Sequence, residues 1–526
     1  MSGYGHTGPG PGFAVRTLYP ERSMTTLTRM PKPSVGDLVA GVSVALVALP
    51  QSLAYAEIAG LPPQYGLFAS ALPPILAALF VSSRYLQTGP VALTALLAYG
   101  ALEPLAQPES ASYIELAALL ALLVGAFRIT LGLLRMGGVA YLLSEPVLTG
   151  FTTGAAVLIL SSQLPKVFDV PTDGDGVLAD ALQALTSPDE WQMGAVGFSV
   201  VTLVFMFGGR RLHKLFPGVL MAVIVGVLVS GGADYGGSTV GELDGGFVSL
   251  SLEFPWDQVG DLVLPALVIA LVGFAEPASI ARTFAAQERE PWDANREMVS
   301  QGVANLAAAV SGAFPVGGSF SRSSLNKLAG AESAWAGAIT GGFVLLALPL
   351  TPLLEDLPNA ILGAIVLGAV IKLVAVVDLW RLVQQNRIQA AVGIGTFAAT
   401  LVSAPRVERG VLIGVGLALG AHLVRELRVT VPSARVGDVL TVAPEGVLWF
   451  ATIPSVDRLI RREIADNPDI DTVVLDLAGV GRMDYSAAAA LRRIVEEIGD
   501  FPNDVAVEIV NVRQGAARGA ALHLED

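Results

Sequence analysis

The feature that most constrains this chain is an apolar, charge-poor stretch that runs from about Val35 to Leu427 and then stops. Charged residues make up only 15% of the 526 residues, whereas soluble globular chains carry about 25%. At roughly 28 residues per membrane span and its loop, a stretch of this length holds about 14 helices. The sequence therefore predicts a polytopic α-helical membrane protein with a different, more polar C-terminal part.

Fourteen spans fit the pattern of apolar segments, and their ends are set by Gly, Pro and charged residues. We predict them at 36–58, 66–82, 90–104, 112–134, 139–163, 193–208, 216–232, 262–286, 295–314, 320–331, 334–354, 360–376, 387–403 and 408–426. Residues 1–35 form a polar leader, partly disordered, with no apolar core followed by a cleavage site, so it is not a secretory signal peptide.

The charges of the loops predict the topology. The leader and the even-numbered connections carry Lys and Arg, whereas the loop 165–191 has one Lys against six acids, and 232–261 has six acids and no Lys or Arg. Because positive loops stay on the cytoplasmic side, both termini are predicted to be cytoplasmic and the two acidic loops external. Twelve spans would satisfy the same parity.

Two predicted spans are unusually short and start with breaks in the helical pattern. The third opens with Thr88-Gly89-Pro90 and the tenth with Pro315-Val316-Gly317-Gly318-Ser319. They occupy matching places in two seven-span halves, 36–232 and 262–426, and such a pair of interrupted helices is typical of a transporter site. An odd-numbered repeat requires the second half to be inverted. The alternative is that Gly and Pro are simply common in membrane helices.

Composition excludes several classes of function. The net charge of −14 argues against a nucleic-acid partner. The absence of Cys excludes disulfides, cysteine–zinc sites and thiol nucleophiles. Four scattered His residues do not build a metal site, and no nucleophile–base pair is visible, so we expect neither a cofactor, nor a metal, nor an enzyme.

The tail, 429–526, has the composition of a small α/β domain. Strands 439–442 and 447–451 flank Pro444-Glu445-Gly446 and are predicted to form a hairpin. A helix at 454–465, a strand at 472–477, a helix at 486–498 and a strand at 505–510 follow.

Several separated motifs resemble the sulfate permease family of anion transporters. They are PQYGLFAS at 63–70, SSR at 82–84 and GGSFSRSS at 317–324, and the tail resembles the STAS domain that those transporters carry. The resemblance covers about 36–526 and implies a seven-plus-seven inverted repeat with a core and a gate domain, usually dimeric. In the tail, Ser486 of Asp484-Tyr485-Ser486-Ala487 is comparable to a phosphorylated serine of bacterial STAS regulators, but the glycine of their motif is missing, which favours a plain helix-start residue.

The resemblance places the anion between the starts of spans 3 and 10. Helix N-termini offer unpaired N–H groups and about half a positive charge, so two facing ends attract an anion. The residues concerned are Gly89, Pro90, Val91 and Ala92 at one start, and Ser319, Phe320, Ser321 and Arg322 at the other. Ser319 and Ser321 are predicted to donate hydroxyls and Phe320 to form an apolar wall.

Three further side chains are candidates for this site. Arg322 lies in the first turn of a span, where the helix dipole and the membrane both oppose a cation, so we interpret it as an anion ligand. A bundle ion pair or a snorkelling residue at the helix end is the alternative. Gln51 and Tyr55 share one face of span 1, follow Pro50, and line the site in the family. Packing between helices is their alternative role.

Two acids are candidates for proton coupling. Glu276 lies well inside span 8 beside Pro277, where relatives keep an acid for ion coupling, and burial favours the neutral form of a carboxyl group. Glu57, near the end of span 1, is either a second proton site or an interfacial side chain. Sodium-coupled relatives have a hydroxyl four residues after the span 8 acid, but this chain has Ile280 there, which favours protons.

The sequence thus predicts a secondary active transporter of small anions in a bacterial inner membrane, working by elevator-type movement. A fumarate-like dicarboxylate taken up with a proton is the preferred substrate; sulfate, bicarbonate and chloride are alternatives. Expected partners are the anion, a proton, lipid, a second copy of the chain and, through the STAS domain, a regulatory protein. Rival functions are a nucleobase–proton symporter, an anion channel or voltage-driven motor, and a regulatory membrane scaffold.

Overall fold

The computed structural model describes residues 32–138, 143–172, 176–213, 216–232, 235–243, 246–426, 429–499 and 505–512. Most of the predicted leader lies outside these residues. The chain divides into two compact units, Met1–Val415 and Gly416–Asp526. This division falls inside helix α16 (Val407–Glu426), and the predicted domain boundary at residue 429 stays a prediction.

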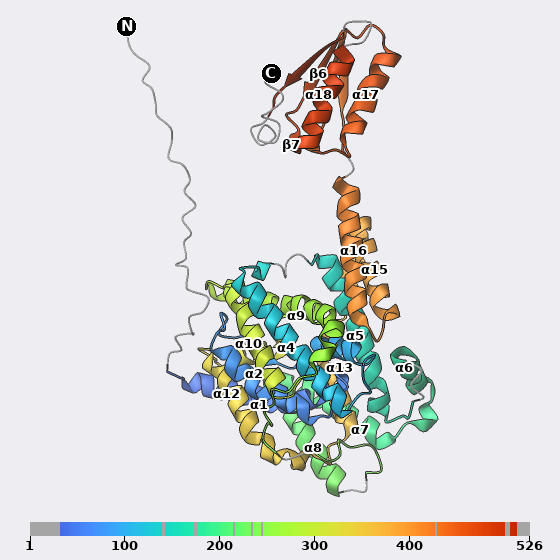
Figure 1. The fold of residues 1–526 in the computed structure, drawn as a ribbon. Coiled ribbons are helices and arrows are strands. Elements are labelled where there is room, and N and C mark those ends of the chain that lie inside the picture. Colours follow the sequence, from blue (N-terminus) through green and yellow to red (C-terminus); the bar gives the residue numbers. More distant parts are fainter. Residues whose placement is uncertain are drawn as a thin grey trace. The chain divides into compact units, whose positions relative to one another are not determined.

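Helices are the main secondary structure of the described part of the first unit (Figure 1). Its first half contains α1 (Val35–Ile58), α2 (Gln64–Ala78), α3 (Ala92–Leu102), α4 (Ala111–Leu133), α5 (Glu145–Phe168), α6 (Val177–Thr186), α7 (Met193–Leu212) and α8 (Gly218–Gly232). Its second half contains α9 (Val259–Glu288), α10 (Ala294–Val310), α11 (Phe320–Leu328), α12 (Trp335–Ala347), α13 (Asn359–Val370), α14 (Val376–Gln385), α15 (Arg387–Val402) and the beginning of α16. Short 3-10 helices lie at Pro188–Glu190, Trp256–Gln258, Leu348–Leu354 and Ile371–Leu373.

A helix lies at each of the fourteen predicted spans, and two helices were not predicted. These two, α6 and α14, have ten residues each and lie between longer spans. Their exposed apolar residues recur on one face, as Val376, Val377 and Trp380 do in α14, so they do not have the continuous apolar character by which a span is predicted. Within the part of the chain that the structure describes, seven helical segments are long and apolar enough to cross a membrane; the count of fourteen crossings stays a prediction.

Most of the large helix–helix contacts of the first unit fall into two groups. In one group, α4 packs on α9 and α10, and α2 packs on α1, α10 and α12. In the other, α5 packs on α7, α13 and α15, and α7 packs on α8. Each group takes helices from both halves of the chain, so that segments distant in sequence lie side by side (Figure 1).

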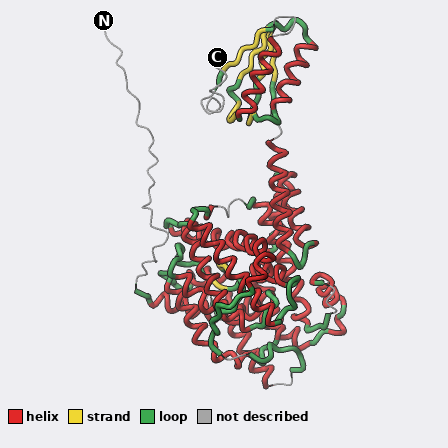
Figure 2. The backbone as a smooth tube through the Cα atoms, in the orientation of Figure 1, coloured by secondary structure: helices red, strands yellow, loops and turns green. Residues whose placement is uncertain are grey.

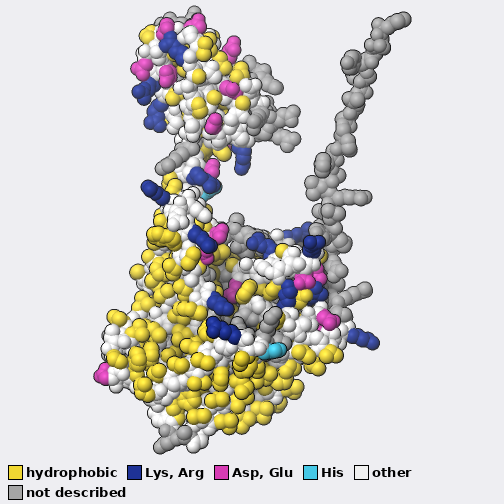
Figure 3. All heavy atoms as spheres, turned by 180° about the vertical axis from the view of Figure 1, so that it is seen from behind, with side chains coloured by type: hydrophobic (Ala, Val, Ile, Leu, Met, Phe, Trp, Pro, Cys, Tyr) yellow, Lys and Arg dark blue, Asp and Glu magenta, His cyan; other side chains and the backbone are white. Residues whose placement is uncertain are grey.

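The surface of the first unit suits a lipid environment. Figure 3 shows hydrophobic side chains in a broad band over the face in view, with Lys and Arg gathered along its upper margin. Leucines such as Leu228 and Leu346 are largely exposed on this surface. Their contact with water is unfavourable, and a membrane removes their apolar area from water.

Asp37 explains where α1 begins. Its backbone N–H donates to Ser34 Oγ at 3.0 Å, and its carboxylate accepts from the Ser34 N–H at 3.1 Å, which completes a capping box. The same carboxylate accepts from the N–H groups of Glu332 and Ser333 at 2.9 and 2.8 Å. One buried acid therefore fixes both the start of α1 and the loop before α12.

The second unit contains a four-stranded sheet in the order β3-β4-β6-β8 and a separate pair, β5-β7 (Figure 2). The strands are β3 (Ser433–Val436), β4 (Val439–Val442), β5 (Gly446–Leu448), β6 (Thr472–Asp476), β7 (Val480–Met483) and β8 (Ala506–Val510), with helices α17 (Ile453–Asp466) and α18 (Tyr485–Gly499).

The predicted hairpin of the second unit is wrong. β4 pairs antiparallel with β3, and the following strand, β5, pairs parallel with β7 instead. Gly437 has a φ of +67° in the two-residue turn between β3 and β4, a conformation that Gly adopts without steric cost. Pro444-Glu445-Gly446 therefore leads the chain from one sheet to the other.

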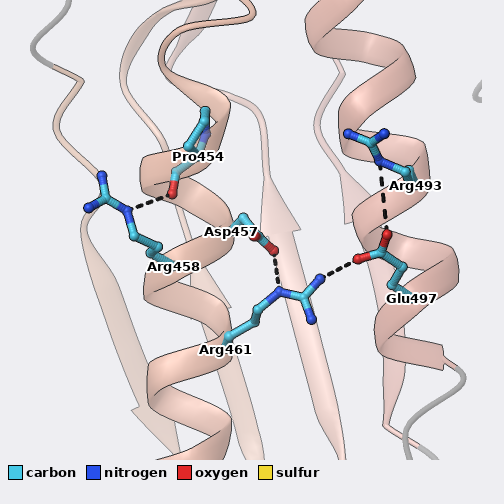
Figure 4. A network of polar contacts seen from close by, with 6 residues as sticks. All are labelled: Pro454, Asp457, Arg458, Arg461, Arg493 and Glu497. Atoms are coloured by element: carbon cyan, nitrogen blue, oxygen red, sulfur yellow. Dashed lines mark hydrogen bonds and ion pairs between the residues drawn. The ribbon is translucent and has the colours of Figure 1, made fainter.

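An ionic network joins the two helices of this unit (Figure 4). Arg461 of α17 pairs with Asp457 at 2.7 Å and with Glu497 of α18, and Arg493 approaches Glu497 at 3.9 Å. The side chains are partly exposed to solvent, so each pair contributes about 0–1 kcal/mol. The buried hydrophobic core between helices and sheet is the main source of stability.

Candidate functional site

Two short strands bring the starts of α3 and α11 together. β1 (Thr88–Gly89) pairs antiparallel with β2 (Gly317–Gly318), so Thr88 faces Gly318 and Gly89 faces Gly317. Figure 2 shows this strand segment among the helices. α3 follows β1 and α11 follows β2 within three residues. The two interrupted spans predicted from the sequence therefore meet at their N-terminal ends, where helix dipoles favour an anion.

Hydrogen bonds of backbone and side-chain groups extend this junction beyond the two strands. The Ser319 N–H donates to the Gln87 carbonyl at 3.0 Å, and the Gln87 N–H donates to Ser323 Oγ at 2.9 Å. Gln301 of α10 donates to Thr88 Oγ1 at 2.8 Å. The starts of the two helices are thus held to each other and to α10.

Arg322 lies across the junction. Its side chain is 2% exposed, and Nη2 donates to the Pro90 carbonyl at 2.5 Å. A Cβ atom on Gly89 would lie only 3.0 Å from Nη1, so glycine is what lets the guanidinium approach the backbone. A buried cation is costly unless it is paired, and the described residues leave its Nε without a hydrogen-bond partner.

Glu276 of α9 reaches the same place from a third helix. Its carboxylate accepts a hydrogen bond from the Phe320 N–H and interacts electrostatically with Arg322. A carboxylate of the chain itself therefore lies at the N-terminus of α11. Pro277 follows directly and removes one backbone donor from α9.

Gln51 and Tyr55 contribute from α1, which packs on both α3 and α11. Both side chains are buried, at 3% and 5% exposure. Tyr55 interacts electrostatically with Arg322 and Glu276, and Gln51 Oε1 is buried without a hydrogen-bond partner among the described residues. Helices α1, α3, α9 and α11 thus converge on one point.

The remaining residues of the predicted set lie in two different settings. Val91 and Ala92 are buried at the start of α3, and Ser319 is buried with its hydroxyl 3.2 Å from that of Ser321. Phe320, predicted as an apolar wall, is 57% exposed. The side of α11 that carries Phe320 and Ser321 is therefore open, whereas the side that carries Arg322 is closed by protein.

Glu57 is not brought to this cluster. It forms an ion pair with Lys166 near the end of α5. The role of Glu57, as a second proton site or an interfacial side chain, stays a prediction.

Two polar residues behind the junction were not predicted from the sequence. Arg128 of α4 is fully buried and donates to three backbone carbonyls, and Asn305 of α10 is fully buried against Val316. An ionisable residue in the middle of a predicted span was the available signal for Arg128. Asn305 gave no comparable signal, since amides are common between membrane helices.

Two sequence patterns of known protein families match this chain. The sequence pattern described as "Sulfate permease family" matches residues 35–396, and that of the STAS domain matches 431–521. The chain belongs to the sulfate permease family. Members of this family are transporters, so the chain is a multi-pass membrane transporter of anions with a STAS domain and not an enzyme.

Relatives in this family span most of the chain. Probable sulfate transporter 4.2 of Arabidopsis thaliana is 31% identical over 88% of this chain and 74% of its own length. Probable sulfate transporter Rv1739c of Mycobacterium tuberculosis is 34% identical over 75% of this chain and 70% of its own length.

Solved structures show the same fold at lower identity. Murine Solute Carrier 26 family member A9, an anion transporter captured in the inward-facing state, aligns with a TM-score of 0.82 at 21% identity over 93% of this chain and 87% of its own. The transmembrane domain of the cyanobacterial bicarbonate transporter BicA aligns with a TM-score of 0.60 at 22% identity over 73% and 97%. The predicted fold class, a helical transport domain followed by a STAS domain, is confirmed.

Proposed function

We propose that this member of the family is a secondary active transporter that moves a small divalent anion together with a proton. The observation that carries the proposal is the pairing of β1 with β2, which sets two helix N-termini, Arg322 and Glu276 around one point. Two N-termini and one guanidinium supply positive potential, and Glu276 supplies a group that can hold a proton.

Sulfate is the first substrate candidate. The relatives that span most of the chain are named sulfate transporters. A tetrahedral dianion accepts hydrogen bonds from several directions at once, and the junction offers donors of different kinds: the Arg322 guanidinium, the Ser319 hydroxyl and the N–H groups of the first turns.

A fumarate-like dicarboxylate is the second candidate, and one specific observation favours it. The Phe320 N–H already binds a carboxylate, that of Glu276. A substrate carboxylate that took this position would compete with Glu276, and protonation of Glu276 would release the N–H for the substrate. Uptake of a proton and binding of the anion are coupled in this way without a long-range conformational signal.

The experiment that tests the proposal is uptake of labelled sulfate, fumarate and bicarbonate into proteoliposomes, with and without an inward proton gradient. Wild-type uptake should saturate and rise with the gradient. Arg322→Ala should lower Vmax/KM roughly 10- to 100-fold, as expected for a lost charge-assisted hydrogen bond. Glu276→Gln should leave uptake independent of the gradient.

Matched controls are Arg381→Ala and Glu115→Gln, which make the same changes at exposed positions of α14 and α4. Gradient-independent, non-saturating flux in the wild type would favour a channel instead. Uptake that is unchanged in both site variants would contradict the assignment of the site.

The proposed mechanism is an elevator movement of the group that contains α1, α2, α4, α9, α10 and α12 against the group that contains α5, α7, α13 and α15. Because α1 contacts α13 across the two groups, cysteine pairs introduced there should stop uptake when cross-linked and restore it when reduced. The chain has no Cys, so the wild type is a clean background. Uptake that continues through the cross-link would contradict the movement.

The cellular setting is part of the same proposal and rests on the family resemblance and on loop charge. The protein is placed in a bacterial inner membrane with both termini in the cytoplasm, as a homodimer, with the STAS domain available to a regulatory protein. Protease accessibility of residue 512 in right-side-out and inverted vesicles tests the topology, and mass photometry of the detergent-solubilised protein tests the dimer.

A further inference from the structure

Arg128 is a buried cation that the proposed transport mechanism does not use. It lies in α4 with no exposed surface. Its Nε, Nη1 and Nη2 donate to the carbonyls of Ala270, Val316 and Ile269 at 3.2, 2.9 and 3.2 Å. None of the ion pairs among the described residues includes it. Three carbonyl dipoles therefore stabilise this charge in place of a carboxylate.

The three carbonyls belong to two segments that bear on the anion site. Ile269 and Ala270 lie in α9, one to two turns before Glu276. Val316 lies directly before β2, three residues before Ser319. Arg128 thus links the helix that carries Glu276 to the strand that leads into α11 and Arg322.

Asn305 also binds the backbone of Val316. Its Oδ1 accepts from the Val316 N–H at 3.0 Å, and its Nδ2 donates to the Val316 carbonyl at 3.1 Å. With Arg128 on that carbonyl as well, both polar groups of Val316 are fixed by side chains from α4 and α10. A two-residue strand has few ladder bonds of its own, so these side chains add to the bonds that hold β2 in position.

The close approach of Arg128 requires glycine on α9. A Cβ atom on Gly273 would lie 2.6 Å from Arg128 Nη2 and 3.0 Å from Thr94 Cγ2 of α3. A side chain there would displace the guanidinium or separate α9 from α3. The absence of a side chain at Gly273 and the length of Arg128 are therefore complementary.

We propose that Arg128, with Asn305, is a positioning group that holds β2 and α9 at the spacing at which Arg322 and Glu276 together receive the anion. This inference rests on the proposed function and adds residues that do not touch the anion. It is the guanidinium geometry, three donors directed at three carbonyls, that matters and not the charge alone.

The experiment compares Arg128→Lys, Arg128→Gln and Asn305→Ala with wild type in the full-length protein. Uptake of labelled sulfate and fumarate over a range of concentrations gives KM and Vmax separately. The unfolding temperature, measured at sulfate concentrations that increase in 10-fold steps, reports binding without transport. Arg128→Lys keeps the charge and loses the three-way geometry, and Asn305→Ala keeps Arg128 and frees Val316. Both should raise KM at least 10-fold. Arg381→Lys, on the exposed surface of α14, is the matched control and should leave KM unchanged.

A wild-type KM in both Arg128→Lys and Asn305→Ala would overturn the proposal. So would a lower Vmax at unchanged KM, because that result means only that less protein is folded. If Arg128→Gln does not fold, Gly273→Ala provides a second disturbance of the same contact and should also raise KM. A wild-type protein that neither takes up nor binds any of the anions contradicts the proposed function itself, and this outcome is distinct from failure of the positioning role.

Discussion

At the scale of single residues, small and polar side chains decide the site more than large ones do. Gly89 leaves room for Arg322, Gly273 leaves room for Arg128, and Gln51 places an unpartnered amide oxygen within the protein. The sequence identified Gly89 and Arg322 at the two interrupted helix starts and Gln51 in span 1, where the resemblance places the anion site. It gave no reason to single out Gly273, because a helical glycine becomes informative only when its neighbour across the helix interface is known.

Gly89→Ala should raise the KM for the anion at least 10-fold. The new Cβ would meet Arg322 Nη1 at 3.0 Å, and Gly89 has a φ of +155°, which L-residues rarely adopt. Saturating uptake in proteoliposomes measures the effect. Gly197→Ala in α7, where a Cβ meets nothing within 4 Å, is the control. An unchanged KM in Gly89→Ala would mean that Arg322 does not need its position against β1.

Asp476 of the STAS domain should make stability depend on pH. The Ala478 N–H at 2.9 Å and Asn511 Nδ2 at 3.0 Å both donate to Asp476 Oδ1, and these bonds lower the pKa of Asp476. A carboxyl whose folded pKa is depressed stabilises the fold above its unfolded pKa of about 3.9 and loses that contribution as pH falls through the folded value.

The test is acid unfolding followed by hydrogen exchange of residues 431–512. Asp476→Asn should be less stable than wild type at pH 7, and the two curves should converge below pH of about 3. Asp438→Asn removes one exposed carboxylate from the same domain and should leave the curve near that of wild type. A constant difference between Asp476→Asn and wild type at every pH would show that the bonds do not depend on its charge.

At the scale of elements, the pieces that position the site are two strands of two residues each and the loops beside them. Helices were predicted at the right places because a span needs a long apolar run, and this is visible in sequence. β1 and β2 were not predicted as strands, because two residues carry no periodicity. The hairpin of the second unit was wrong for a related reason: a turn motif identifies a reversal but not the partner of the next strand.

Glu297 of α10 should be more important to stability than any surface ion pair. Its buried Oε2 accepts from the N–H groups of Ser82 and Ser83 at 3.2 and 2.9 Å and from the Trp292 indole at 3.3 Å. Glu297→Ala leaves these donors without an acceptor and should cost about 3 kcal/mol. Glu497→Ala, in the exposed network of Figure 4, should cost at most about 1 kcal/mol.

Hydrogen exchange, resolved by peptide, measures the loss of stability in each variant: in the first unit for Glu297→Ala and in the second unit for Glu497→Ala. A cost below about 1 kcal/mol for Glu297→Ala would mean that water or a rearranged loop replaces the carboxylate.

At the scale of the whole molecule, the buried hydrophobic residues that the structure describes form separate cores in the two units: a large cluster with three smaller ones in the first unit, and one cluster in the second. All residues of the proposed site lie in the first. In the scaffold alternative, the STAS domain is the functional part, and function would depend on the second unit instead of on the site in the first. Family membership favours transport over the scaffold alternative. The sulfate permease pattern matches residues 35–396, and the STAS pattern matches residues 431–521 in addition.

Deletion of 429–526 should leave saturable anion uptake with a KM within about 3-fold of wild type, because no residue of the site is removed. Vmax is not expected to stay the same, because the deletion also affects assembly or regulation through the STAS domain. Reconstituted protein, quantified by immunodetection of an N-terminal tag, separates Vmax from the amount present. Abolished uptake in a deletion that still folds, together with normal uptake in full-length Arg322→Ala, would support the scaffold instead.

By itself, the sequence determined the membrane character, the places of the helices, the α/β nature of the tail and, through its motifs, the two helix starts and Arg322. The membrane character and the places of the helices follow from local composition, because a segment inside lipid must be apolar and must satisfy its own backbone polar groups. The helix starts and Arg322 follow from local motifs. Only the tertiary structure decided that β1 pairs with β2, that Glu276 joins Arg322 while Glu57 pairs with Lys166, and that Arg128 and Asn305 hold Val316. Such contacts join residues far apart along the chain. They depend on how helices pack against one another, and no local pattern records that packing.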